Sequence, residues 1–194
     1  MAFLDDDYWS KRYQIGQTGW DIGYPSPPIV QYLDQFKNKD IKILIPGAGN
    51  AHEGSYAFEK GFRNIHLLDI SIKAIENFKN KNPDFPSDQL HHQDFFLHEG
   101  TYDLIIEQTF FCAINPQKRE DYLIKNKQLL KPKGSLLGVL FDREFHFKGP
   151  PFGGRLDDYL TLFEKYFSKG FISPCYNSIP ERMGSELWIH WVNQ

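Results

Sequence analysis

The sequence predicts an α/β protein with a doubly wound, mostly parallel sheet. Three observations support this class. A short apolar run at 41–45 is followed by a glycine turn, a helical segment and a second apolar run at 64–68. Later apolar runs keep alternating with helical segments, as they do in parallel sheets covered on both faces. An aspartate, Asp69, follows the second run directly, about twenty residues beyond the glycines, where nucleotide-binding α/β folds place an acid that holds a ribose.

The turn after the first apolar run is the strongest local pattern in the chain. Gly47 and Gly49 allow a sharp turn and let a ligand approach the backbone without meeting a Cβ atom. We expect Asn50 to cap the next helix, with Glu53 at the capping-box position three residues later. The same residues would also fit a tight turn that binds nothing.

The residues after the glycines indicate which ligand suits this turn. A dinucleotide lays its pyrophosphate on the helix N-terminus and requires a third glycine there, but His52 occupies that position. Glu53 adds a negative charge that suits the helix dipole and repels a phosphate. A ligand with an adenosine and no phosphate fits better, and S-adenosylmethionine, which carries a positive sulfonium, is the common one.

Composition narrows the class of protein. The 194 residues are 41% hydrophobic and 24% charged, which predicts one globular domain over 1–194. The net charge of −3 gives no reason to expect a nucleic-acid partner. The two cysteines, Cys112 and Cys175, lie far apart, and no apolar run approaches membrane length, so we expect a reduced, cytoplasmic protein without a membrane partner. We expect a monomer.

Residues 1–28 are predicted to form an aromatic arm. The aspartates at 5–7 can cap a short helix, on which Trp9 and Tyr13 share one face. Trp20 lies in the Gly- and Pro-rich loop that follows. The three rings would either roof the core or form a lid over a cationic ligand, where each cation–π contact contributes roughly 0.5–2 kcal/mol.

The remaining elements follow in order along the chain. They are a helix opened by Pro27 and Pro28, a helix over 72–80 capped by Ser71, a third strand at 89–92, a fourth at 102–107, a helix over 116–130, a turn at 131–134, a fifth strand at 135–141, a lid-like loop at 142–154, a helix over 156–167 and an antiparallel strand pair at 171–176 and 186–192.

Two residues after the third strand lie where a purine would be expected. The carboxylate of Asp94 can accept the exocyclic amine of an adenine, and the ring of Phe95 can pack on the base. Asp94 could equally be a plain helix cap.

Five motifs stand out along the chain. They are W-x3-Y-x6-W-D-x-G from Trp9, L-I-P-G-A-G-N at 44–50, L-L-D-I-S at 67–71, F-F-C-A-I-N-P-x-x-R at 110–119 and G-P-P-F at 149–152. These motifs resemble those of class I methyltransferases, and in particular the thiopurine methyltransferase family with its plant-type halide and thiol methyltransferases. The resemblance covers nearly the whole chain and implies a seven-stranded Rossmann-like methyltransferase sheet with a C-terminal antiparallel strand.

The resemblance implies a role for each matching position, with S-adenosylmethionine as the cofactor. Gln108 falls where the halide and thiol enzymes often have Tyr, and Tyr13 stands where Trp is usual. Arg119 matches an arginine near cofactor and substrate. The cofactor contacts implied are the aromatic cover of Trp9, Tyr13 and Trp20, Gly47 under the methionine end, Asp69 on the ribose, Asp94 and Phe95 at the adenine, and Gln108.

The implied reaction is an in-line methyl transfer to a small soft nucleophile, namely a thiol, bisulfide, thiocyanate, halide or thiopurine. Such nucleophiles arrive as anions, and the sequence shows no Ser–His–Asp or Cys–His arrangement that would supply a base. No histidine has metal-ligand spacing, so we expect no metal. A nicotinamide-dependent oxidoreductase and a non-catalytic S-adenosylmethionine-binding protein are the alternatives.

Overall fold

The computed structural model describes residues 4–194, and its centre is one seven-stranded sheet in the order β3-β2-β1-β4-β5-β7-β6. Only β7 runs antiparallel to its neighbours β5 and β6, which confirms the predicted class. The strands are β1 (Ile43–Pro46), β2 (Ile65–Asp69), β3 (Leu90–His92), β4 (Tyr102–Gln108), β5 (Leu130–Phe141), β6 (Lys169–Pro174) and β7 (Glu186–Val192).

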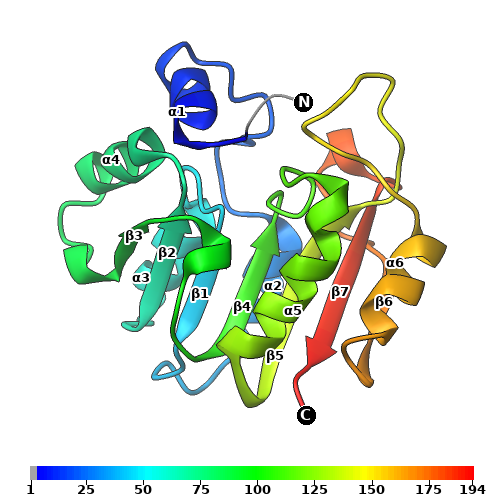
Figure 1. Ribbon diagram of the computed structural model, residues 1–194. Coiled ribbons are helices and arrows are strands. Elements are labelled where there is room, and N and C mark those ends of the chain that lie inside the picture. The colour runs from blue at the N-terminus through cyan, green and yellow to red at the C-terminus, as the bar shows by residue number, and fades with distance from the viewer. Residues whose placement is uncertain (1–3) are drawn as a thin grey trace.

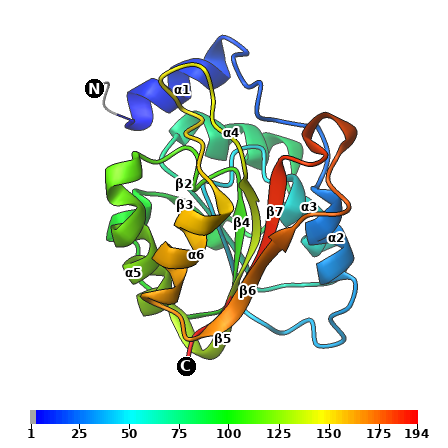
Figure 2. The same cartoon turned by 90° about the vertical axis from the view of Figure 1, so that its right-hand side faces the viewer.

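Helices cover both faces of this sheet (Figure 2). One core, around Ile29, Ala57 and Phe78, lies under α2, α3 and α4. The other, around Tyr122 and Phe163, lies under α5 and α6. The α-helices are α1 (Asp6–Gln14), α2 (Pro27–Leu33), α3 (His52–Glu59), α4 (Ile72–Lys81), α5 (Arg119–Leu129) and α6 (Leu156–Glu164), with short 3₁₀ turns at Ser87–Gln89, Phe95–Leu97, Pro116–Lys118 and Pro180–Arg182.

The start of α3 differs from the predicted capping box. Ala51, in the left-handed region at φ 47°, precedes the helix, and no side chain caps it. Asn50 instead donates to the carboxylate of Asp21 in the arm. Glu53 is buried and accepts the backbone N–H of Ser26 at 2.9 Å. Both side chains therefore join α3 to the chain before it, which local sequence patterns do not show.

The predicted turn at 131–134 is an irregularity within β5. Tyr102 pairs with Leu130 and Leu104 pairs with Ser135, so residues 131–134 bulge out of the ladder. Lys133, at φ 67°, donates its backbone N–H to the carbonyl of Asn193 at 2.7 Å. Residues 131–134 therefore belong to the strand because Lys133 bonds to Asn193, sixty residues further along the chain. Helix α6 also ends earlier than expected, at Glu164, and β6 begins earlier, at Lys169.

Candidate active site

The arm and the 142–154 loop both lie at the carboxyl edge of the sheet (Figure 1). Asp5 caps α1 by accepting the N–H of Tyr8, as predicted. Helix α1 then docks on the start of α4, where Oδ1 of Asp6 accepts the N–H of Ile72 at 3.1 Å. The hydroxyls of Ser10 and Ser71 lie 2.9 Å apart in the same contact. The arm is therefore fixed above the ends of the strands.

The glycine turn after β1 lies below the arm. Gly47 and Gly49 have φ values of 59° and 57°, which glycine adopts without strain. A Cβ atom on Gly47 would collide with the ring of Phe110. A Cβ atom on Gly49 would lie 2.6 Å from the hydroxyl of Tyr13. The turn therefore provides a surface of bare backbone between an aromatic ring and a phenol.

Asp69 ends β2 beside this turn. Its Oδ2 accepts the N–H of Gly49 and its Oδ1 accepts the N–H of Ser71, both at 2.8 Å. The side chain is 6% exposed, and burial raises its pKa to about 6. Since a carboxylate has about four acceptor positions, two remain for the hydroxyl groups of a ribose.

The structure brings the three arm aromatics together. The rings of Trp9 and Trp20 meet edge to face with centroids 5.5 Å apart, and those of Tyr13 and Trp20 do so at 5.8 Å. Burial and the nearby charge of Asp69 raise the pKa of Tyr13, so its hydroxyl keeps its proton. The three rings thus form one packed group, and Tyr13 lies next to Gly49 and Asp69.

Asp94 and Phe95 lie in the turn after β3. Asp94 caps that turn by accepting the N–H of Phe96 at 2.9 Å. Phe95 is 2% exposed, and its ring lies 5.2 Å from that of Phe110. Phe95 therefore supports the ring of Phe110, which lies against Gly47. Oδ2 of Asp94 has no hydrogen-bond partner among the described residues.

Gln108 ends β4, next to the glycine turn. Its Oε1 atom is buried and finds no hydrogen-bond partner in the part of the chain that the structure describes. Because an unpaired buried acceptor costs about 1–3 kcal/mol, this atom marks a position where a bound donor would be favoured.

Glu107, one residue earlier, was not predicted to be a site residue. Its carboxylate is fully buried and accepts the N–H groups of Phe110 and Phe111, at 2.8 and 2.9 Å, and the hydroxyl of Tyr122 at 2.6 Å. Burial raises its pKa to about 7. These bonds shape the turn that presents Gln108 and Phe110 to the site. An acid closing a buried apolar strand was the signal that could have revealed this role.

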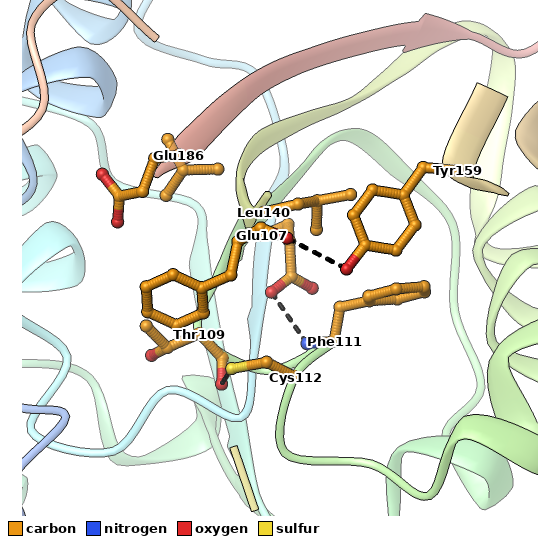
Figure 3. A pocket seen from close by; sticks show the side chains of 9 residues that line it. Glu107, Thr109, Phe111, Cys112, Leu140, Tyr159 and Glu186 are labelled. Carbon is orange, nitrogen blue, oxygen red and sulfur yellow. Dashed lines mark hydrogen bonds between the residues drawn. The ribbon is translucent and has the colours of Figure 1, made fainter. Parts of the chain in front are cut away.

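A small cavity of about 10 Å³ opens beside this turn (Figure 3). That volume holds about one water-sized group. Burial and then the charge of Glu107 raise the pKa of the Cys112 thiol in its wall to about 12. The lining residues are Glu107, Thr109, Phe111, Cys112, Val139, Leu140, Phe141, Tyr159 and Glu186.

Arg119 fastens the 142–154 loop over this cavity. Its Nη2 donates to the carbonyl oxygens of Phe152 and Gly153, at 3.3 and 2.8 Å. Its guanidinium lies 4.7 Å from the ring centre of Phe111, which lines the cavity. Burial lowers its pKa, and its buried Nε has no partner among the described residues. The positive charge of Arg119 is therefore held beside the cavity, with one donor free.

Arg182 is a second cation near the site, and no local sequence pattern predicted it. It follows β6 and forms a 3.3 Å ion pair with Glu186, and both side chains are almost buried. Its Nη2 donates to the backbone oxygen of Trp20 at 2.7 Å. The C-terminal part of the chain thus holds the arm, a contact across 162 positions that no local pattern reveals.

Over residues 4–194, no three His, Cys, Asp or Glu side chains are grouped so that they could hold a metal ion. No helix within the same range is long and apolar enough to cross a membrane.

Known structures and sequences agree with this arrangement. The 1,6-didemethyltoxoflavin-N1-methyltransferase of Burkholderia thailandensis, solved with S-adenosylhomocysteine, superposes with a TM-score of 0.76 at 13% identity, over 97% of this chain and 87% of that one. Fold and site together define a class I S-adenosylmethionine-dependent methyltransferase. The sequence model of the Thiopurine S-methyltransferase family matches residues 4–173, and the chain belongs to that family.

Plant relatives match most of the length of the chain. The chain is 31% identical over 156 residues to the probable thiol methyltransferase 2 of Arabidopsis thaliana, covering 78% of this chain and 69% of the relative. It is 29% identical over 194 residues to the thiocyanate methyltransferase 1 of Brassica oleracea, covering 97% and 85%. S-adenosylmethionine is accordingly the cofactor. Three features of the site fit it: the glycine turn without side chains, the carboxylate of Asp69 and the unpaired Oε1 atom of Gln108. The nicotinamide-dependent alternative finds no support in these comparisons.

Proposed function

We propose that this methyltransferase acts on a small, soft nucleophile that arrives as an anion: a thiolate, bisulfide, thiocyanate, halide or thiopurine thiolate. The proposal rests on the environment of Arg119. Its partly buried guanidinium and its buried, unpartnered Nε–H lie beside a cavity that holds about one water-sized group. A partly buried cation that forms no ion pair with any described residue favours an anion.

The acidic and thiol groups in the cavity wall support a reaction without a base. Glu107 is engaged in three hydrogen bonds, Glu186 is paired with Arg182, and the Cys112 thiol stays protonated. A neutral acceptor would need one of these groups to take its proton. An acceptor that is already ionised needs none.

The cofactor, when bound, supplies an electrophilic methyl group on a sulfonium with a neutral leaving group. Our assignment places Asp69 on the ribose, Asp94 and Phe95 at the adenine, Gly47 and Gln108 at the methionine end, and Trp9, Tyr13 and Trp20 over the site. The protein's part is then to align the two reactants and exclude water, which can contribute about 7–11 kcal/mol in favourable cases.

Incubation with methyl-labelled cofactor and a panel of iodide, bisulfide, thiocyanate, thiophenol and 6-mercaptopurine tests this function. We expect label in the volatile or extractable product of at least one acceptor, and a rate with thiophenol that follows its thiolate fraction. Cofactor binding by calorimetry without transfer to any acceptor would establish the non-catalytic alternative instead.

We also propose a monomeric, cytoplasmic, single-domain enzyme with no nucleic-acid or membrane partner. Two buried free cysteines and the net charge of −3 support this description. Sedimentation at several concentrations tests the oligomeric state.

A further inference from the structure

The part of the arm that carries Trp20 bridges the mouth of the site. On one side, the backbone oxygen of Trp20 accepts a bond from Arg182, which follows β6. On the other side, the next residue, Asp21, reaches the start of α3. These two contacts fix the backbone at Trp20 and at the residue directly after it.

The contact of Asp21 with α3 is polar, specific and partly buried. Nε2 of His52 donates to Oδ1 of Asp21 at 2.8 Å, and Asn50 donates to Oδ2. The N–H of Gly23 also donates to Oδ1, at 2.8 Å. The side chains of His52 and Asp21 are 27% and 19% exposed, so water screens the pair only in part. Asn50 and His52 both follow shortly after the glycine turn at 47–49, which we assign to the cofactor.

We infer that Asp21, held by His52 and Asn50, is a positioning residue that latches the aromatic arm shut over the cofactor. The inference rests on the proposed cofactor site. An aromatic ring on a loop contributes to binding only after the loop has become ordered. The free energy that this ordering costs reduces the free energy of binding. The latch supplies part of that ordering within the protein, so that Trp20 stands near its closed position before the cofactor arrives.

The chemistry of the latch gives it a pH dependence. The hydrogen bond from Asp21 raises the pKa of His52, and the same bond lowers the pKa of Asp21. The other charged groups that face His52 are Glu53 on α3, which favours the imidazolium, and Lys81 on α4, which opposes it. Closing the arm brings Asp21 to His52 and so favours proton uptake. The latch is therefore strongest below the pKa of His52 and weakens as pH rises through it.

Calorimetry of S-adenosylhomocysteine binding to the full chain tests the latch. We expect Asp21→Asn and His52→Leu to weaken binding about tenfold to a hundredfold, as loss of a charge-assisted bond predicts. Asp34→Asn is the matched control, because Asp34 also bonds a residue of α3, Tyr56 at 2.7 Å, but lies outside the arm. The control should bind as the unaltered protein does.

His52→Gln separates a latch from a merely structural contact. The glutamine amide can still donate to Asp21 but cannot titrate, so affinity should be largely retained. The fall in affinity that we expect of the unaltered protein as pH rises through the pKa of His52 should disappear. This readout also stands if Asp21→Asn fails to fold.

Trp20→Ala distinguishes failure of the latch from failure of the site. Unchanged affinity in Asp21→Asn and His52→Leu overturns the latch. If Trp20→Ala still binds weakly in that case, the cofactor site and the proposed function stand. If Trp20→Ala also binds normally, the aromatic cover was assigned wrongly and the latch falls with it.

Discussion

The backbone N–H of Gly49 donates a hydrogen bond of 2.8 Å to Oδ2 of Asp69. The bond joins the glycine turn after β1 to the acid at the end of β2. It therefore fixes the carboxylate relative to the turn, and the protein holds both parts of the predicted ribose site in one arrangement.

Asp69→Ala should abolish measurable binding of S-adenosylmethionine in a calorimetric titration. The substitution removes the ribose acceptor and leaves the N–H groups of Gly49 and Ser71 without their partner, at a cost of about 1–3 kcal/mol each. Asp69→Asn, which keeps one acceptor oxygen, should retain part of the fold stability with much weaker binding. Wild-type affinity in Asp69→Ala would refute the ribose assignment.

Gly47→Ala should destabilise the protein and remove cofactor binding. Its φ of 59° is strained for alanine by about 1–3 kcal/mol, and the new Cβ would collide with the ring of Phe110. Gly61→Ala is the control, since Gly61 has a φ of 94° with open space around its Cβ position. Thermal unfolding should show the larger loss in Gly47→Ala, and only that variant should lose binding. Equal losses in both variants would mean that strain alone matters.

Glu107→Gln should remove a pH dependence of the free energy of unfolding. The folded protein keeps a proton on Glu107 up to about pH 7, whereas the unfolded chain releases it near pH 4.5. Stability from this group is thus present at low pH and declines as pH rises to about 7, by about 3 kcal/mol in total. Urea titrations at several pH values measure the slope.

The difference in slope between the two proteins from pH 6 to pH 7 is diagnostic, because Asp69 and the histidines with shifted pKa values titrate alike in both. Over this range the unaltered protein should lose stability relative to Glu107→Gln. Identical slopes in this window would show that Glu107 is ionised throughout.

Arg119→Leu should raise the KM for thiocyanate or bisulfide about tenfold or more, while the cofactor Kd stays unchanged. The substitution removes the partly buried charge and the buried, unpartnered Nε–H donor, and a hydrogen bond to a charged group contributes about 1.5–3 kcal/mol. Lys118→Leu removes the neighbouring exposed cation and serves as the control. A KM that rises equally in both variants would assign the effect to general charge rather than to this site.

Local patterns predicted those parts of the site that the chain builds from neighbouring residues. The glycine turn, the acid after β2 and the serine cap of α4 each depend on backbone needs that a few residues satisfy. Asn50 and Glu53 were assigned wrongly for the same reason. Their partners, Asp21 and Ser26, lie 29 and 27 residues away, and a capping pattern cannot register competitors at that distance.

The sequence by itself determined the fold class, the family and the residue types at the carboxyl edge, because periodicity and motif spacing are local properties of the chain. Only the tertiary structure decided that Glu107 shapes the turn after β4 and that Arg119 fastens the loop over the cavity. It also decided that the arm is joined to α3 through Asp21 and to the segment before β7 through Arg182. A buried polar group bonds to whichever partner the packing brings within about 3 Å. The order of the strands in the sheet, and not the distance along the sequence, therefore decides which residues form these hydrogen bonds.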